Sequence, residues 1–468
     1  MTRAIVGNCL AALVAAVEFG KAGISTALFS NGKRWGGHFA GIDLNGVHYD
    51  LGMSVVELSS GRIERDPSYE SYDPSVRNDV GRFFGHLQVY VNSLVPLHNL
   101  NTPECFFRGA FSEDFILCNS FDLLSHFSES EKALIADQIC ERNSSDVLHA
   151  ANKVTQQHLH SRVSYKESSY FNHGQYLHNE VLEPFVLKIT ARSSENVSSI
   201  LHRRIWAPLY YPETILQALQ GLNPLESKTD ISYPKGGSFA AFAAALLDEL
   251  KSYRCVTIYD DPIAELLIDS GRLFTSKGDQ IYFQNLAWGA PINDLRTLIN
   301  ASPFPNPKMD RTSLAFDFLL VKASDLRRRI TIVFVIDEQF SCFRVTNQTE
   351  CAGSEESFVR LVVEYNLEYL CARGITEDGE IHQETLRCLR GMGILSKGSE
   401  VISTVKRAER LLPIPNHAYE SGALENIGQV ETLVPQVTLF GESSGVGTRS
   451  FADNFVQGLK LSRETNKT

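Results

Sequence analysis

Three small residues near the N-terminus have the spacing of a diphosphate-binding turn. Gly7, Cys9 and Ala12 follow the apolar run at positions 4–6 and lead into residues 10–21, where apolar residues recur at helical spacing. The unpaired N–H groups at the start of such a helix bind phosphate. In the dinucleotide fingerprint, the three positions serve a tight turn, close phosphate approach and helix–strand packing. Cys9 replaces the second glycine, and its side chain is expected to crowd a diphosphate unless the backbone shifts.

The residues around this turn predict a strand–helix–strand unit. Positions 24–29 form a second apolar strand, parallel to the first because a helix crosses between them. Ser30 ends this strand, where the fingerprint has an acidic residue for a ribose. Ser30 with Lys33 and Arg34 also has the chemistry of an NADP site, in which small and basic residues accept a 2′-phosphate. The alternative is an ordinary unit that packs a helix on a sheet and binds no nucleotide.

A glycine-rich turn and a hairpin follow the second strand. Gly36 and Gly37 form the turn, and residues 42–51 alternate around Asn45 and Gly46. An Asn-Gly pair between alternating apolar residues is a strong signal for a two-residue hairpin.

Residues 5–52, taken as a whole, resemble the FAD-binding start of the flavin amine oxidase superfamily. That group includes amine oxidases, protoporphyrinogen oxidase, phytoene-desaturase-type enzymes and UDP-galactopyranose mutase. Three later stretches match the same family in the same order: the Tyr-Pro-x-Gly-Gly element at 233–237, the short strands at 256–283 and the glycine-rich stretch at 439–458. The resemblance implies an α/β fold, in which a Rossmann-like FAD-binding domain carries an inserted α+β substrate domain of antiparallel sheet plus helices.

The resemblance also implies an order of domains. The FAD-binding domain takes residues 1–60, 231–295 and 431–468, a mostly helical substrate or cap region takes 61–230, and an antiparallel-sheet substrate domain takes 296–430. Four strand-like stretches fit that sheet, at 312–321, 330–336, 340–345 and 358–365. Ser238 is a candidate N-cap for a helix over residues 239–250.

The family's cofactor contacts can be carried over to matching positions. A backbone group at Ile263 is expected to pair with adenine, and Gly441 with Glu442 to reach the ribityl or pyrophosphate region. The helix that begins near Ser450 presents free N–H groups to the flavin pyrimidine. His38 stands where amine oxidases often have an arginine, and it is expected to reach a phosphate or the flavin edge, or to be an exposed structural residue. The expected cofactor-binding residues are Gly7, Cys9, Ala12, Ser30, Arg34, Gly36, Gly37, His38, Ile263, Gly441, Glu442, Ser450 and Phe451.

Two residues are candidates for the chemistry on the substrate. Arg344 lies in the strand-like stretch 340–345, and the galactopyranose mutases place an arginine on a comparable strand, facing the substrate's phosphates. Tyr211 belongs to a region that shapes the substrate cavity in the family. The alternatives are a solvated strand arginine and a tyrosine in a packed helical layer. The strand at 312–321 has no interior lysine, which argues against amine oxidation specifically.

Composition limits the kinds of partner. The chain has 468 residues, 43% of them apolar and 21% charged, with a net charge of −11. Such an acidic chain is not expected to bind nucleic acid or an anionic membrane. Its nine cysteines form no Cys-x-x-Cys pair and no zinc or iron–sulfur spacing, which suits a reducing cytosol. No stretch reaches the ~18 apolar residues of a membrane helix. We therefore expect a cytoplasmic protein with a small-molecule substrate, whose oligomeric state the sequence leaves open.

Three functional readings follow. The first is an FAD-dependent oxidoreductase that transfers a hydride from a small organic substrate to flavin. The second is a non-redox flavoenzyme acting on a nucleotide sugar, like UDP-galactopyranose mutase. The third is a cofactor-free protein that keeps the fold and acts as a binding partner. FAD is the expected cofactor because the glycine and acidic residue at 441–442 match the family, and NADP is the second choice.

Overall fold

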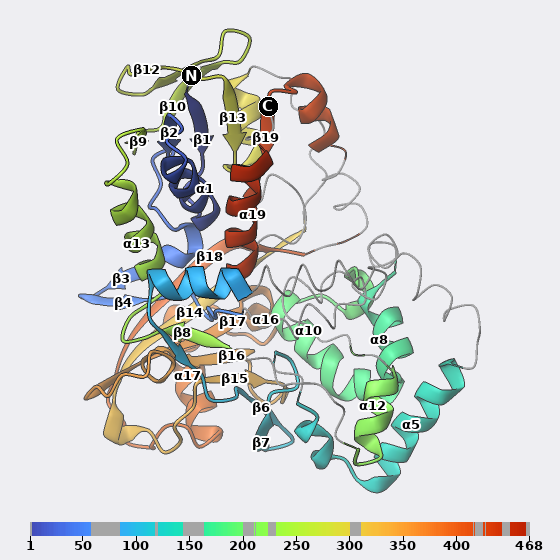
Figure 1. Ribbon diagram of the computed structural model, residues 1–468. Helices are drawn as coiled ribbons and strands as arrows, with labels where there is room; N and C mark the ends of the chain where they lie inside the picture. The colour runs from blue at the N-terminus through green and yellow to red at the C-terminus, as the bar shows by residue number, and fades with distance from the viewer. Residues whose placement is uncertain are drawn as a thin grey trace.

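Five parallel strands from distant parts of the chain make up one sheet (Figure 1). In order across the sheet they are β19 (Val437–Leu439), β13 (Asn285–Trp288), β1 (Arg3–Val6), β2 (Thr26–Phe29) and β9 (Val256–Tyr259). The computed structural model describes residues 2–57, 85–117, 120–143, 163–199, 210, 212–222, 231–299, 310–414, 416, 425, 427–441 and 450–464. The parallel pairing of β1 with β2 confirms the predicted strand–helix–strand unit.

Helix α1 (Leu10–Lys21) joins β1 to β2 with the bounds that the sequence predicts. It is apolar on nearly all sides because α13 (Ala240–Leu250) and α19 (Phe451–Glu464) pack against it. The approach of α19 is close at Gly458, where a Cβ would lie 2.7 Å from the Ala11 carbonyl oxygen. The C-terminal helix thus completes the core around the N-terminal one (Figure 1).

Smaller strands surround this sheet. β3 (Ile42–Leu44) and β4 (Val47–Tyr49) form the predicted hairpin, with Asn45 and Gly46 both at positive φ. β10 (Ile263–Leu267), β11 (Arg272–Thr275) and β12 (Gln280–Tyr282) form an antiparallel sheet, and β5 (Leu97–Asn99) pairs with β8 (Ser232–Pro234).

A seven-stranded sheet forms the second large layer. Its order is β18 (Val401–Pro413), β14 (Arg311–Lys322), β17 (Phe358–Asn366), β16 (Arg344–Asn347), β15 (Ile332–Val335), β6 (Glu104–Phe107) and β7 (Ala110–Glu113). The predicted strands at 312–321, 330–336 and 358–365 are β14, β15 and β17, and the antiparallel pairing is confirmed. The predicted strand at 340–345 starts too early, because it shares only its last two residues with β16. The sheet is mixed, however, because β15 pairs parallel with β6. The sequence analysis missed β18, an edge strand whose alternation is obscured by charged residues.

Helices cover both faces of this second sheet. α17 (Asp378–Gly391) packs on one face, and the other face joins the core around α1. Shorter helical elements on or near the sheets are η1 (Gly37–Ala40), α14 (Ile292–Leu298), η5 (Ala323–Asp325), α15 (Gln348–Cys351) and α16 (Leu367–Ala372). A helical layer lies to one side (Figure 1) and contains η2 (Asp122–His126), α5 (Glu129–Asn143), α8 (Tyr165–His173), α9 (Gln175–Leu177), the π-helical turn η3 (His178–Leu182), α10 (Glu183–Thr190), η4 (Ser194–Asn196) and α12 (Pro212–Leu219). The helix at residues 85–94 lies apart from this layer, and its Tyr90 packs against Phe455 of α19. Within the described residues, every helix is too short or too polar to span a bilayer.

Candidate dinucleotide site

The N-terminus of α1 has the features of an anion site. Gly7 follows β1 with φ of 156°, and its N–H donates to the Phe29 carbonyl at 2.9 Å. Cys9 is the N-cap residue, and its side chain makes no capping hydrogen bond. The first turn of α1 contains no acidic residue. Among the described residues, neither the Cys9 side chain nor an acidic residue of the first turn caps the positive end of this helix.

The glycine-rich turn is fastened to the start of α1. Gly36 and Gly37 have φ of 99° and 60°, values that favour glycine. The Gly36 N–H donates to the Asn8 carbonyl at 2.7 Å, and the Asn8 side chain donates to the Arg34 carbonyl at 2.7 Å. A Cβ on Gly37 would lie 3.6 Å from the α-carbon of Cys9. The turn therefore packs directly against the N-cap of α1.

Gly441 reaches the same place from the other end of the chain. It follows β19 by two residues, and its N–H donates to the Gln457 Oε1 on α19 at 2.7 Å. A Cβ on Gly441 would lie 4.0 Å from the Cys9 Sγ. We use the name α1 cradle for residues 7–10 together with Gly36, Gly37 and Gly441. The predicted site residues Glu442 and Tyr211 lie outside the described residues.

Predicted contacts to the adenosine half lie beside β2, where they hydrogen-bond within the protein. Ser30 is buried, and its hydroxyl donates to the Asp260 carbonyl at 3.1 Å. The Ile263 N–H donates to the Asn31 Oδ1 at 3.0 Å, so this backbone donor, predicted to contact adenine, already has a partner. Arg34 is exposed and pairs with the equally exposed Asp43 at 3.0 Å.

The predicted flavin contacts differ in exposure. His38 is exposed, with its ring 3.8 Å from the ring of Phe39. Phe451 is only 2% exposed and packs against Phe39 and Phe242, with ring centroids 5.8 Å and 4.6 Å apart. Ala12 is fully buried in α1. Phe451 and Ala12 therefore contribute to the core, whereas His38 reaches the surface.

The start of α19 is capped by its own residues. The Asp453 N–H donates to the Ser450 Oγ at 3.1 Å, and the Ser450 N–H donates to the Asp453 Oδ2 at 3.3 Å. This reciprocal pair gives both the Ser450 N–H and the Asp453 N–H an acceptor at the helix end. α19 thus differs from α1, whose N-cap side chain makes no such bond.

Asp50 is a buried residue that hydrogen-bonds to three segments distant in sequence, and local sequence patterns did not reveal this role. Its carboxylate accepts the Phe239 N–H at 3.1 Å and the Tyr233 hydroxyl, while its backbone carbonyl accepts the Gln348 side chain at 2.9 Å. Burial raises the pKa of the Asp50 carboxyl to about 6, against the effect of these hydrogen bonds. Phe239 is the N-cap position of α13, so the prediction that Ser238 caps this helix is wrong. The capping acceptor comes instead from Asp50, far away in sequence.

Arg344 lies on β16, as predicted, but its charge is paired. Its Nε and one terminal nitrogen bind the two carboxylate oxygens of Glu364 at 2.6 Å each. The side chains are 14% and 2% exposed, and Glu364 also accepts the Met53 N–H at 3.1 Å. Such bidentate geometry holds the guanidinium in one orientation and neutralises it. A role for Arg344 toward an anionic substrate remains a prediction.

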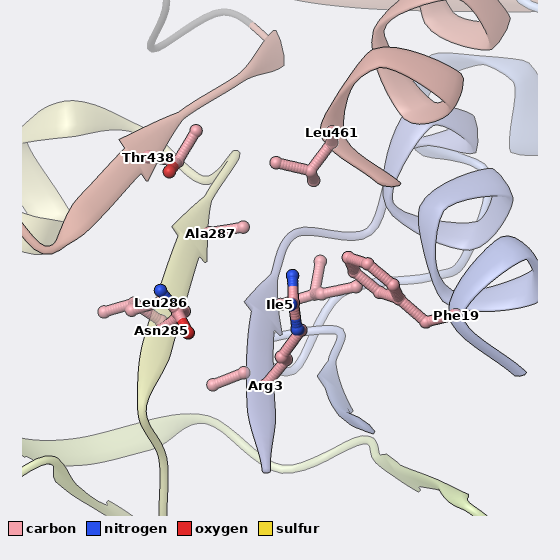
Figure 2. A pocket seen from close by; sticks show the side chains of 9 residues that line it. Arg3, Ile5, Phe19, Asn285, Leu286, Ala287, Thr438 and Leu461 are labelled. Carbon is pink, nitrogen blue, oxygen red and sulfur yellow. The ribbon is translucent and has the colours of Figure 1, made fainter. Parts of the chain in front are cut away.

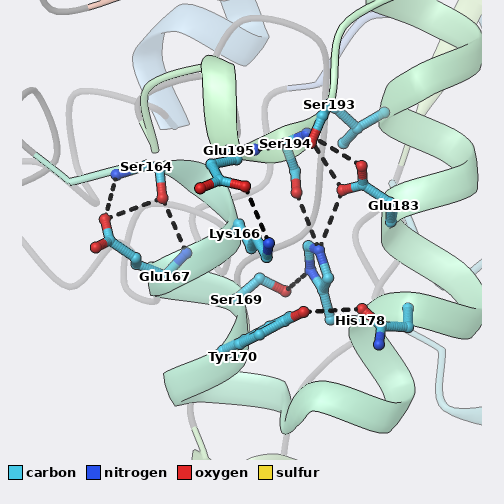
Figure 3. Close-up of polar contacts among 12 residues, drawn as sticks. Ser164, Lys166, Glu167, Ser169, Tyr170, His178, Glu183, Ser193, Ser194 and Glu195 are labelled. Carbon is cyan, nitrogen blue, oxygen red and sulfur yellow. Dashed lines mark hydrogen bonds and ion pairs between the residues drawn. The ribbon is translucent and has the colours of Figure 1, made fainter.

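A second polar cluster lies in the helical layer (Figure 3). The Ser169 hydroxyl lies 2.8 Å from His173 Nδ1 and 2.7 Å from His178 Nδ1. The other nitrogen of His178 lies 3.0 Å from the Ser194 hydroxyl and 3.3 Å from a Glu183 carboxylate oxygen. Serine, histidine and glutamate are the components of a hydrolase triad. Ser169 and both histidines have no exposed surface, so this cluster is placed to stabilise the layer.

The proton positions in this cluster follow from its donors. The Tyr210 N–H donates to His173 Nε2 at 2.8 Å, so that nitrogen carries no proton. His173 therefore donates from Nδ1 to Ser169, and Ser169 donates onward to His178. Burial lowers the pKa of His173 to about 3, in agreement with a neutral ring. These hydrogen bonds, which all run in one direction, join the helical segments α8, η3, α10 and η4.

The small void in Figure 2 is too small to be a ligand site. It has a volume of about 10 Å³ and lies between β1, β13 and the helices α1 and α19. Arg3 and Asn285, the first residues of the two strands, contribute to its lining. A space of this size suits at most one water molecule. Among the described residues, no group of three or more His, Cys, Asp or Glu side chains is placed to hold a metal ion.

No family model and no curated protein sequence matches this chain. Solved structures, however, match along its whole length. A reduced UDP-galactopyranose mutase gives a TM-score of 0.71 at 15% identity, covering 100% of this chain and 95% of that chain. An Exiguobacterium protein assigned as a protoporphyrinogen oxidase gives 0.66 at 16% identity, covering 100% and 98%. A putrescine oxidase bound to putrescine gives 0.59 at 14% identity, covering 100% of both chains.

At these identities the likeness concerns the fold. It agrees with the α/β arrangement described above and with the resemblance seen in the sequence. The chain therefore has the same fold as these solved structures.

Proposed function

We propose that this protein is an FAD-dependent oxidoreductase that transfers a hydride from a small organic substrate to flavin. The observation that carries the proposal is the meeting of three distant segments at the N-terminus of α1. Cys9 packs against both Gly37 and Gly441, and Gly36 is hydrogen-bonded to the residue before Cys9. In sheets of this type, dinucleotides bind where a helix N-terminus follows the carboxyl end of a strand.

The backbone of the α1 cradle fits a dinucleotide diphosphate. Its N–H groups at the start of α1 would hold the phosphates, and the two glycine segments would let the backbone approach them closely. Ser30 lies at the end of β2, on the side expected for the adenosine half. FAD bound there would supply the hydride acceptor, and the protein's part is to orient it and to exclude water.

The pairing of Arg344 on the second sheet argues against a nucleotide-sugar substrate. The face of this sheet that adjoins the α1 core carries Phe316, Phe318 and Phe334, all buried. Tyr49 at the end of β4 packs against Phe318, with ring centroids 5.2 Å apart, so this face adjoins the FAD-binding domain. The only strand arginine that we predicted to meet a phosphate, Arg344, is neutralised by Glu364. We therefore prefer a small organic substrate to a nucleotide sugar.

The test is the absorbance of the full-length purified protein between roughly 350 and 500 nm, with FAD added where the preparation is colourless. An oxidoreductase is expected to show a flavin spectrum that is bleached by a panel of small amines or other organic donors without oxygen. NADPH is the comparison ligand, since NADP was the second expected cofactor. A folded protein that binds neither nucleotide would contradict the proposal and favour a cofactor-free binding partner.

A further inference from the structure

Phe440 lies across the ends of two central strands. It follows β19, and its N–H donates to the Trp288 carbonyl at 3.0 Å, which extends the pairing with β13. A Cβ on Gly289 would overlap the Phe440 ring, and a Cβ on Gly7 would lie 3.2 Å from its Cζ. The residue is only 4% exposed. The ring therefore packs on the backbone at the carboxyl ends of β13 and β1.

This is the edge of the sheet where a dinucleotide would cross. The fingerprint uses glycine at the end of the first strand so that the chain can turn tightly beside the phosphates. At Gly7 the space left by the absent side chain is taken by an aromatic ring of the same protein. A phenyl ring offers no hydrogen-bond donor, so it replaces none of the contacts that a phosphate or ribityl hydroxyl needs.

Cys9 fills the neighbouring part of the α1 cradle. A Cβ on Gly37 would lie 3.6 Å from the Cys9 α-carbon, and a Cβ on Gly441 would lie 4.0 Å from the Cys9 Sγ. Cys9 therefore lies close to both glycine segments, at the position where the fingerprint has a glycine to admit a phosphate. The backbone of the cradle fits a dinucleotide, and the side chains of Cys9 and Phe440 do not.

We propose that Cys9 and Phe440 together close the α1 cradle, so that this protein binds FAD weakly and releases it readily. The inference rests on the proposed function and concerns how firmly the same site holds its cofactor. FAD binding requires the Phe440 ring to leave the strand ends and the backbone to shift around Cys9. The two side chains act on the diphosphate, which FAD and ADP share and which riboflavin lacks.

The experiment measures dissociation constants of FAD, ADP and riboflavin for the full-length protein and for C9G, F440A and the double variant. Each single variant is expected to bind FAD and ADP at least about tenfold more tightly than the wild type, and the double variant more tightly still. Riboflavin affinity is expected to stay unchanged. C255G and F283A are matched controls, because Cys255 and Phe283 lie outside the α1 cradle.

The outcomes separate this inference from the proposed function. If the wild type and all variants bind FAD equally tightly, the proposal that Cys9 and Phe440 close the cradle is wrong, and the proposed flavoprotein function stands. If every variant has a native circular dichroism spectrum and none binds FAD, both are wrong. If C9G or F440A fails to fold, C9A or F440L is used in its place, because these variants keep more of the native packing. An equal gain in the two control variants would also overturn the proposal, because it would show a general loosening of the domain.

Discussion

The α1 cradle and the Arg344–Glu364 pair are two places where this protein could meet a charged ligand, and they are built in different ways. In the cradle, the positive potential comes from backbone N–H groups at a helix end without a capping side chain. On the second sheet, a full positive charge is cancelled by a carboxylate at 2.6 Å. The formal charge of a residue is therefore a poor guide to where an anion would bind. The backbone site is the better candidate.

The largest expected effect comes from removing one half of the ion pair. Glu364→Ala leaves the Arg344 guanidinium without its partner on a mostly buried sheet face, and we expect the free energy of unfolding to fall by about 3–5 kcal/mol. Chemical denaturation measures this. The double variant R344M/E364L removes both charges and should recover most of the loss. A single variant that loses less than about 1 kcal/mol would mean that the pair is effectively solvated.

A second prediction concerns a buried carboxylate that belongs to neither region. Asp50 connects the start of α13 to Gln348 near the second sheet, and its pKa in the folded protein is about 6 against an ordinary value of 3.8. The folded state therefore binds this proton more tightly than the unfolded state does. Its contribution to stability is complete below about pH 4 and is lost as the pH rises through about 6.

This contribution is on the order of 2–3 kcal/mol, at about 1.4 kcal/mol for each pKa unit. Asp50→Asn keeps one oxygen acceptor and removes the titration. Thermal unfolding at a series of pH values should show a wild-type loss of stability between about pH 4 and 6 that the variant lacks. Parallel curves for the two proteins across that range would show that Asp50 titrates as an ordinary carboxyl.

A third, smaller effect is expected from a substitution that gives α1 a capping side chain. Cys9→Ser supplies a hydroxyl that accepts an N–H in the first turn, and we expect about 1 kcal/mol of added stability. The same hydroxyl should compete with a bound diphosphate, so ADP affinity should not improve as it does for C9G. Thermal unfolding of C9S beside C255S checks the first point, since Cys255 is not an N-cap. A loss of stability in C9S alone would indicate that the N-terminal amides are already satisfied.

The smallest effect is expected at an exposed cation whose backbone carbonyl accepts a hydrogen bond from Asn8 in the cradle. Arg34 and its partner Asp43 are 55% and 60% exposed, so Arg34→Ala should change the free energy of unfolding by less than about 0.5 kcal/mol. FAD affinity should also be unchanged if backbone groups supply the binding. Titration with FAD and NADPH measures this. A large loss confined to NADPH would instead support the 2′-phosphate site that Ser30 and its basic neighbours suggested.

Local patterns in the sequence were enough to find the elements that build the cradle. Apolar spacing gave the bounds of α1, and the Asn-Gly pair gave the hairpin of β3 and β4. Partners distant in sequence were not visible. Asp50 caps a helix 189 residues away, and the carboxylate that neutralises Arg344 comes from a neighbouring strand. Phe440 also went unnoticed, because the ordinary aromatic residue before Gly441 gives no sign that its ring rests on Gly7 and Gly289.

The order of strands in the parallel sheet has a consequence for synthesis. β1 and β2 leave the ribosome first, but their neighbours β9, β13 and β19 are encoded far downstream. The nascent N-terminal unit therefore carries unpaired strand edges and an apolar α1 until most of the polypeptide has been translated. Exposed edges of this kind are prone to association with other chains. We expect this protein to depend on chaperones during translation, and its native structure to form only after the C-terminal helix has been released.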